Sequence, residues 1–295
     1  MVASTDEGRV LVLLLDTSAG MWEQLRRNEA QKGSAEIPQL GKANFVQQVL
    51  LFLNTYLMLQ EGNKATVFAV DGHGSHLLHT PPLSSGQSKA KQHATQSAAE
   101  EVLQKLLLHV QANLPGQASL PCWSAALSRA LCFIHKQQQS TPTAGTEGSK
   151  PRILCITGSP DVPAQYIATM NAIFSAQRHG IVIDTCTVGR QDSAFLQQAA
   201  HISEGVYLRP KHTGALLQYL LTVYAADTYT RSFMQMPKLT GVDFRASCFC
   251  HKKTIDMGYV CSVCLSIFCQ KLSECSTCGT PFSASVPATQ TPRIT

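Results

Sequence analysis

Short, uninterrupted apolar runs alternate with longer amphipathic segments along most of the chain. Apolar side chains fill 10–15, 67–70, 153–156 and 181–183. Strands that are buried on both faces of a sheet have this pattern. We therefore predict four buried strands, together with a hairpin strand over 76–78 and one further short strand late in the alternating region.

Three segments carry apolar residues at the spacing of one helical face. The clearest of these stripes consists of Phe45, Val49, Phe52, Leu53 and Tyr56. The same spacing recurs over 102–110 and 216–224. The predicted order is strand, helix, strand, hairpin strand, two helices, strand, helix, strand, helix, short strand and helix. This alternation predicts an α/β fold, with a doubly wound, mostly parallel sheet covered by helices on both faces.

Length and composition exclude several classes of protein. A chain of 295 residues with 44% apolar residues can bury one ordinary core and a small second one. A net charge of +5 is too small to indicate a nucleic-acid binder. The run 10–15 is too short to cross a membrane, and its acidic neighbours Asp6 and Glu7 are unlike a signal peptide. We therefore expect a protein that is made and kept inside the cell, without a membrane span.

The cysteines are unevenly distributed. Seven of the eleven lie between Cys248 and Cys278, and the other four are scattered through apolar segments. Inside the cell thiols stay reduced, so a dense local cluster indicates metal ligation rather than disulfide bonds. The scattered cysteines are expected to be small buried apolar residues.

Two CxxC pairs give the most specific signal in the chain. Cys261 and Cys264 form the first pair, and Cys275 and Cys278 form the second. Each pair fits on one tight turn, and two facing turns supply the four sulfurs that tetrahedral Zn²⁺ prefers. A redox-active dithiol would instead be a single CxxC pair near a strand–helix–strand unit. We predict a C4-type zinc finger at these four residues.

The remaining candidate ligands near this finger are Cys248, Cys250, His251 and Cys269. In a cross-braced module, the first and third ligand pairs share one metal ion while the second and fourth share another. The spacing fits this arrangement imperfectly, because Cys248 and Cys250 are one residue apart and Cys269 has no neighbouring ligand. A histidine followed by two lysines is also typical of a solvated surface. The sequence leaves open whether the module holds one ion or two.

The charge of the cysteine-rich region favours protein over nucleic acid as its partner. Residues 242–295 contain five basic and three acidic residues, and four thiolates with one Zn²⁺ bring the module to about neutral. Binding through phosphates requires clustered positive charge. Apolar side chains such as Tyr259, Val260 and Ile267 exceed what so small a module can bury. We expect docking against protein and no direct contact with nucleic acid.

A second constellation lies at the end of the first predicted strand, where Asp16 and Ser18 follow the aliphatic run. Doubly wound folds bind ligands at the carboxyl ends of their strands, and these oxygens could contribute to a magnesium site. No GxGxxG, GxxxxGK or GxSxG motif follows a predicted strand, which argues against nucleotide binding and serine hydrolysis. We expect Asp16 to hydrogen-bond the loop after its strand.

Taken together, these segments resemble a known family. The strand ends LLLDTS, ILCIT and IVIDTCTVG resemble a von Willebrand A-type domain. The segment CFCHKKTIDMGYVCSVCLSIFC, followed by CSTCG, resembles the small subunits of the TFIIH core, which join such a domain to a carboxyl-terminal four-cysteine zinc finger. The resemblance covers roughly residues 8–282.

The resemblance implies a non-catalytic structural protein without a small-molecule substrate. It implies binding to other TFIIH core subunits, chiefly the larger subunit of similar domain make-up. The complex would serve transcription initiation by RNA polymerase II and nucleotide excision repair in the nucleus. The family's zinc ligands fall on Cys261, Cys264, Cys275 and Cys278.

The metal motif of von Willebrand A-type domains carries over poorly. Its DxSxS form matches Asp16 and Ser18, but Gly20 replaces the second serine. Gly158 stands where a later acidic ligand is expected, and Asp161 comes three residues further on. The resemblance therefore implies a degenerate site that does not hold a metal ion.

The expected organisation is a von Willebrand A-like domain over 8–229, a linker over 230–245, the zinc finger over 246–283 and a disordered tail over 284–295. An alternative function is that of a zinc-braced, RING-like component of a ubiquitin ligase, which would require eight well-spaced ligands. Metal-dependent adhesion is a third class, and it would require an extracellular protein.

Overall fold

The computed structural model describes residues 9–30, 40–60, 62–81, 91–112, 120–140, 151–237, 241–242, 244–251, 253–264 and 266–282. The chain divides into two compact units, Met1–Asp243 and Phe244–Thr295. The tail expected over 284–295 lies outside the described residues. Among the described helices, none combines the length and hydropathy needed to cross a bilayer.

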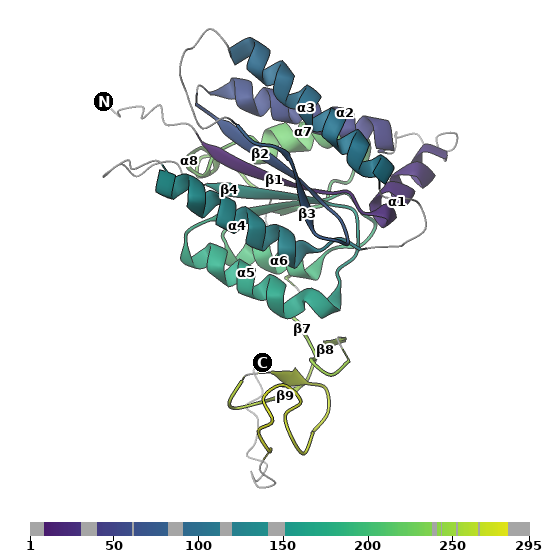
Figure 1. Ribbon diagram of the computed structural model, residues 1–295, viewed down its shortest axis with the longest axis vertical. Helices are drawn as coiled ribbons and strands as arrows, with labels where there is room; N and C mark the ends of the chain where they lie inside the picture. Colours follow the sequence, from purple (N-terminus) through teal and green to yellow (C-terminus); the bar gives the residue numbers. More distant parts are fainter. Residues whose placement is uncertain are drawn as a thin grey trace. The chain divides into compact units, whose positions relative to one another are not determined.

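A six-stranded sheet forms the centre of the larger unit, with the strand order β3-β2-β1-β4-β5-β6 (Figure 1). The antiparallel pair is β2 with β3, and the other neighbouring strands are parallel. This arrangement confirms the predicted mostly parallel sheet. The strands are β1 (Val10–Asp16), β2 (Lys64–Val70), β3 (Ser75–His79), β4 (Arg152–Thr157), β5 (Val182–Thr187) and β6 (Tyr207–Leu208).

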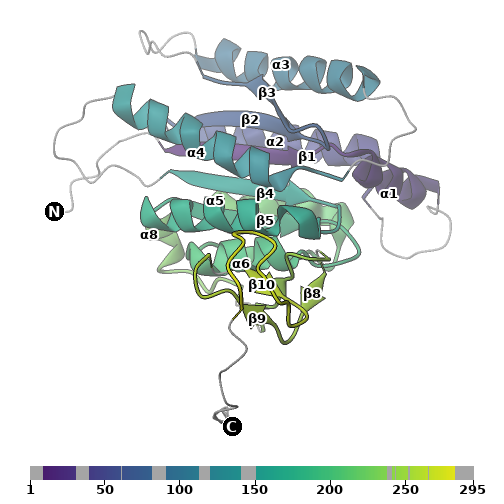
Figure 2. The same ribbon diagram turned by 60° about the horizontal axis from the view of Figure 1, so that its bottom comes forward.

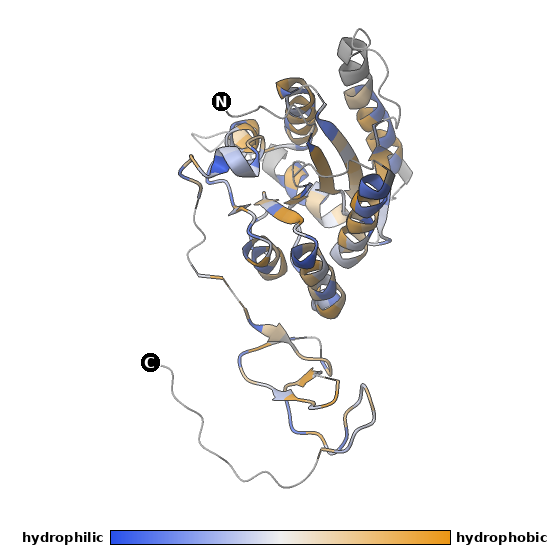
Figure 3. Cartoon of the chain, turned by 90° about the vertical axis from the view of Figure 1, so that its left-hand side faces the viewer, coloured by the Kyte–Doolittle hydropathy of each residue, from blue (hydrophilic) through white to orange (hydrophobic). Residues whose placement is uncertain are grey.

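The central strand β1 contributes to two separate cores because its side chains alternate between the faces of the sheet. Leu11, Leu13 and Leu15 belong to one core, and Val12 and Leu14 belong to the other. All five are essentially inaccessible to solvent. Figure 3 shows the resulting pattern, with apolar colouring along the strands and mixed colouring on the helices. The uninterrupted aliphatic run is therefore the sequence of a strand covered on both faces.

Helices cover both faces of the sheet, as predicted. The first core is covered by α1 (Ala19–Ala30), α2 (Lys42–Leu59) and α7 (Leu216–Tyr219), while α3 (Lys91–Ala112) packs against α2 and β3. The second core is covered by α4 (Trp123–Ser140), α5 (Tyr166–Arg178) and α6 (Ala194–Ile202). These three lie side by side in chain order (Figure 2).

The predicted element order was wrong in two places. It omitted α1, in which Met21 and Leu25 are the fully buried apolar residues among the side chains described over 19–27, so its stripe is too short to detect. The helix predicted over 216–224 is interrupted, because α7 passes into a π-helical turn, η3 (Leu220–Tyr224). The shorter helical segments are η1 (Pro163–Gln165), η2 (Thr213–Ala215) and α8 (Thr228–Arg231).

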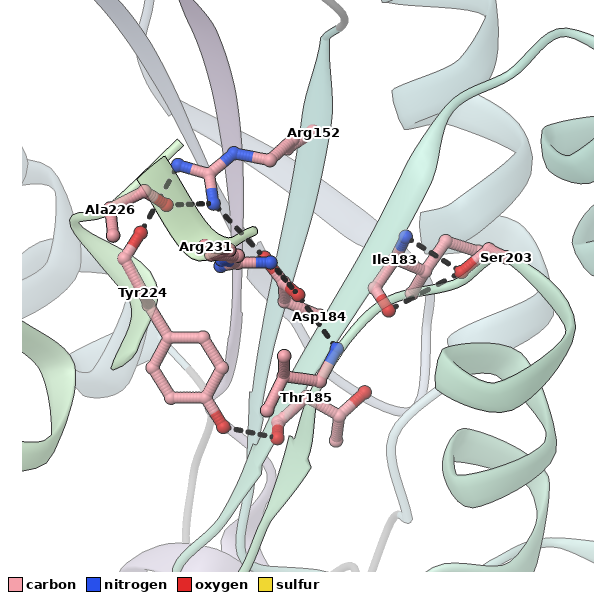
Figure 4. Close-up of polar contacts among 9 residues, drawn as sticks. Arg152, Ile183, Asp184, Thr185, Ser203, Tyr224, Ala226 and Arg231 are labelled. Atoms are coloured by element: carbon pink, nitrogen blue, oxygen red, sulfur yellow. Dashed lines mark hydrogen bonds and ion pairs between the residues drawn. The ribbon is translucent and has the colours of Figure 1, made fainter. Parts of the chain in front are cut away.

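A buried ionic network fastens the last helical segments of the larger unit to the sheet (Figure 4). Asp184 on β5 accepts two hydrogen bonds from Arg231, at 2.8 and 2.7 Å. Arg152 on β4 lies 3.4 Å from the same carboxylate and donates to the carbonyl oxygens of Tyr224 and Ala226. The side chains of all three ionic residues are at most 8% exposed. Because each charge has partners, the network can stay ionised inside the protein.

The smaller unit is built from short antiparallel pairs. Strand β7 (Ala246–Ser247) pairs with β8 (Thr254–Ile255), and β9 (Tyr259–Val260) pairs with β10 (Ile267–Phe268). Among its described side chains, the fully buried ones are Phe268, Cys261 and Cys275 together with Cys248 and Ser266. So small an apolar core leaves much of the stability to the cysteines.

Candidate metal centre

Three turns with the same backbone hydrogen bond carry six of the seven cysteines of the smaller unit, all except Cys269. The N–H groups of Cys248, Cys261 and Cys275 each donate to the carbonyl oxygen five residues later, at 2.8, 2.9 and 2.8 Å. The side chain three residues after each of these cysteines completes the turn. It is His251 in the first turn, Cys264 in the second and Cys278 in the third.

The second and third turns bring the predicted quartet together. The ligand atoms of Cys261, Cys264, Cys275 and Cys278 all lie within 4.8 Å of one another. The sulfur of Cys261 is 3.7 Å from that of Cys278, and the sulfur of Cys264 is 3.5 Å from that of Cys275. Tetrahedral coordination with Zn–S bonds of 2.3 Å separates the sulfurs by about 3.8 Å. The four sulfurs therefore fit the coordination shell of a metal ion.

Hydroxyl groups support the thiolate form within this quartet. The sulfur of Cys264 lies 3.1 Å from Ser266 Oγ, and contacts with Ser266 lower the pKa of the thiol to about 6. Contacts with Thr280 likewise lower the pKa of Cys278. Thiolates are the form in which cysteine binds metals.

The second candidate set also converges. The ligand atoms of Cys248, Cys250, His251 and Cys269 lie within 4.8 Å of one another. Cys269 Sγ is 3.4 Å from Cys250 Sγ and 3.1 Å from Nδ1 of His251. These distances are close to the roughly 3.5–3.8 Å between neighbouring N and S ligands of tetrahedral zinc. The spacing that looked irregular in the sequence is explained by His251, which takes the position of the second cysteine in the first turn.

The two sets alternate along the chain and share one apolar centre. The ring of Phe268 is fully buried and packs edge-on against Phe282. Phe249, which lies between two ligands of the second set, also packs against the ring of Phe268. An ion in either set would therefore fix chain segments on both sides of Phe268.

The strand-end constellation has a different arrangement. Asp16 is completely buried, and its Oδ1 accepts the backbone N–H of Ser18 at 3.0 Å. Its Oδ2 accepts the N–H groups of Gly158 and Ser159 at 3.1 and 3.0 Å. The hydroxyls of Ser18 and Ser159 are 2.7 Å apart. Asp16 therefore hydrogen-bonds the loop after its own strand and also joins that loop to the one after β4.

Neither of the two later positions of the von Willebrand A-type metal motif, Gly158 and Asp161, places a carboxylate beside Asp16. A Cβ at Gly158 would lie 2.1 Å from Sδ of the buried Met21, so a side chain there would require Met21 to move. Asp161 instead accepts hydrogen bonds from the Ser193 hydroxyl and the Phe195 N–H, at the beginning of α6. Burial raises the pKa of Asp161. The carboxylate of Asp161 therefore pairs with the beginning of α6.

One further polar cluster in the described part of the chain, formed by Asp71, His76 and His109, was not predicted from the sequence. These residues come from the end of β2, from β3 and from α3, and no local spacing relates the last residue to the first two.

Comparison with known proteins gives consistent matches. The sequence matches the family described as "Transcription factor Tfb4" over residues 9–279. It is 43% identical to "General transcription and DNA repair factor IIH subunit TFB4" of Arabidopsis thaliana, covering 95% of this chain and 91% of the relative. It is 40% identical to "General transcription factor IIH subunit 3" of Dictyostelium discoideum, covering 84% of this chain and 70% of the relative.

The larger unit also has a solved structural relative. It is similar to the structure entitled "Crystal Structure of the TFIIH p34 N-terminal Domain", with a TM-score of 0.62 and 26% sequence identity. The similarity covers 74% of this chain and 98% of that one. The von Willebrand A-like fold expected from the strand ends is confirmed by this match. The alternative of a ubiquitin ligase component finds no support among these relatives, since each is named as a subunit or domain of TFIIH.

Proposed function

The chain belongs to the Tfb4 family of subunits of the general transcription and DNA repair factor IIH, and from this premise we propose that it is a non-catalytic structural subunit of that complex. It binds other TFIIH core subunits, chiefly the larger subunit with a von Willebrand A-type domain and zinc fingers. It acts in the nucleus, in transcription initiation by RNA polymerase II and in nucleotide excision repair. The observation that carries the proposal is the family match over residues 9–279, which includes both the sheet and the cysteine quartet.

The hydrogen bonding at the carboxyl ends of the central strands supports a structural role. Folds of this type bind ligands beyond the carboxyl ends of the strands. Here Asp16 directs both carboxylate oxygens at protein hydrogen-bond donors, and Ser18 and Ser159 contact one another. The side chains at the carboxyl ends of β1 and β4 therefore hold the two following loops together. This arrangement suits a domain that binds partners through its outer surface.

Zn²⁺ is the ion proposed for Cys261, Cys264, Cys275 and Cys278. Four thiolates in tetrahedral positions favour zinc over oxygen-binding cations such as Mg²⁺ or Ca²⁺. The domain organisation proposed on this basis is a von Willebrand A-like domain over 8–229, a linker over 230–245 and a zinc module over 246–283.

A second Zn²⁺ is proposed for Cys248, Cys250, His251 and Cys269, which makes the module cross-braced. The support is the common turn geometry, since Cys248 has the same N–H hydrogen bond as Cys261 and Cys275. Replacement Cys269→Ser should remove one equivalent of zinc and leave the ion of the quartet in place, because none of the quartet's ligands is changed.

Co-purification tests the structural role. The full-length chain, tagged and expressed in cells, is recovered from nuclear extract and its partners are identified by mass spectrometry. The expected result is recovery of the TFIIH core subunits, including the larger von Willebrand A-type subunit. Recovery without any TFIIH subunit would contradict the proposal.

The same experiment with Cys261→Ser tests the contribution of the zinc module. Loss of this ligand should release zinc and unfold the module, because metal-binding free energy is folding free energy in so small a unit. Cys132→Ser is the matched control, since Cys132 is exposed on α4, contrary to the expectation that the scattered cysteines are buried. Zinc content equal to that of the unsubstituted chain in Cys261→Ser would refute the assignment of this ligand.

A further inference from the structure

Three potential metal ligands meet in the larger unit, far from the cysteines in the sequence. Asp71 follows β2 directly, His76 lies on β3, and His109 lies in the last turn of α3. Both imidazole Nε2 atoms are 3.3 Å from the same carboxylate oxygen, Oδ2 of Asp71. The two rings are 4.6 Å apart between centroids. One oxygen and two nitrogens, each a possible metal ligand, therefore lie within 4.8 Å of one another.

The two imidazole–carboxylate distances fit a coordination shell and are longer than short charge-assisted hydrogen bonds. A charged N–H donor lies about 2.7–2.9 Å from a carboxylate oxygen that accepts its proton. Ligands around zinc, with bonds of about 2.0–2.1 Å to N and O, are about 3.3–3.4 Å apart in a tetrahedron. The two observed separations of 3.3 Å agree with the second value.

The backbone holds the carboxylate of Asp71 in a fixed orientation. Its Oδ1 accepts the N–H groups of His73 and Gly74 at 2.8 and 2.9 Å. The main chain of Asp71 donates to the carbonyl oxygen of Gly74 and accepts from the N–H of Cys122. Gly74 has a φ of +145°, which favours glycine in this tight turn. With Oδ1 engaged by the turn, Oδ2 is directed at the imidazoles, as partners outside a coordination shell orient the ligands within it.

Two of the three side chains are largely buried and the third is half exposed, so the site is held in place and is still accessible to an ion. The side chains of Asp71 and His109 are 3% and 12% exposed, whereas that of His76 is 48% exposed. An ion can enter from the side of His76 and meet ligands that are already in place.

We propose that Asp71, His76 and His109 form a two-histidine, one-carboxylate site for a divalent transition-metal ion such as Zn²⁺. Imidazole and carboxylate ligands suit zinc, and three protein ligands leave a coordination position for water or for a side chain of a partner. The ion would fasten α3 to the β2–β3 turn. This site is separate from the cysteine module and does not depend on the function proposed above.

The test compares zinc binding by three forms of the full-length chain. The unsubstituted chain, the double variant His76→Gln/His109→Gln and the control His73→Gln are titrated with Zn²⁺ against a chromophoric chelator. His73 is exposed in the same turn and contributes only its backbone N–H to Asp71. The double variant should bind one equivalent less than the unsubstituted chain, and the control should bind the same number.

A second measurement covers the case in which the double variant folds poorly. The single change His76→Gln replaces a half-exposed side chain, and it should weaken the affinity of this equivalent by at least about tenfold, since even groups that only orient ligands contribute this much. Zn²⁺ should raise the melting temperature of the larger unit in the unsubstituted chain and less so in His76→Gln, because an ion that binds the folded state stabilises it.

Equal zinc equivalents and affinities in all forms would overturn the proposal, and the three side chains would then be a hydrogen-bonded cluster only. Because the comparison is between variants of the larger unit, failure of either cysteine site changes the total count but not this difference.

Discussion

Single residues in this protein have roles that depend on what lies opposite them. His251 is followed by two lysines and resembles a solvated residue in the sequence, yet its Nδ1 lies 3.1 Å from Cys269 Sγ. Asp184 sits within an apolar strand, where a charge would be unfavourable without Arg152 and Arg231. In both cases the partner comes from a distant segment.

The buried network gives a prediction at this scale. Replacement Arg231→Met should lower the free energy of unfolding by about 3 kcal/mol, because it leaves the buried carboxylate of Asp184 with one weaker ionic partner. Arg209→Met is the matched control, since Arg209 pairs with Asp192 at the surface and both side chains are 44% exposed. That change should alter stability by less than about 1 kcal/mol. Urea unfolding of both variants measures these changes. Similar decreases in the free energy of unfolding in the two variants would contradict the prediction.

Helices could be predicted where the apolar pattern was long, and the prediction failed where this pattern was short. The stripe from Phe45 to Tyr56 gives the 18-residue helix α2, whereas α1 has too few buried apolar residues to detect. The stripe over 216–224 was read as one helix, but it contains a π-helical turn. The side-chain spacings of an α-helix and a π-helix are too similar for periodicity to separate them over about two turns.

The beginning of α6 gives a prediction at the scale of an element. Ser193 caps this helix by accepting the N–H of Leu196 at 3.1 Å, and it donates its hydroxyl to Asp161. Replacement Ser193→Ala should lower the free energy of unfolding by about 1–2 kcal/mol through loss of the cap.

Ser128→Ala serves as the control for this change. Ser128 is exposed on α4, where its hydroxyl only donates to a carbonyl of its own helix. Thermal or urea unfolding of both variants should show a loss confined to Ser193→Ala, and an unchanged stability of that variant would contradict the capping role.

The whole molecule consists of two units that are stabilised in different ways. The larger unit has two apolar cores on opposite faces of one sheet. The smaller unit has one small cluster around Phe268, made largely of cysteines and aromatic rings. Apolar burial can support the first unit, while we expect the second to depend on the metal ions proposed for its cysteines.

Removal of metal should therefore affect the two units differently. With a strong chelator, the amide NMR signals of residues 244–282 should lose their dispersion, while those of the sheet in the larger unit remain dispersed. Addition of Zn²⁺ should restore the lost signals. Dispersed signals from 244–282 after complete removal of zinc would show that the smaller unit folds without an ion.

The sequence by itself determined the buried strands, the mostly parallel sheet and the cysteine quartet. Each depends on neighbours within a few positions, as in the run from Val10 to Leu15 or the pair Cys261 and Cys264. Only the tertiary structure decided that Asp16 joins two loops, that Asp184 holds Arg231, and that His109 meets Asp71. These groups come from segments that crossover connections bring to the same edge or face of the sheet. Local spacing carries no information about such pairings, because the path of the chain between the segments fixes which side chains meet.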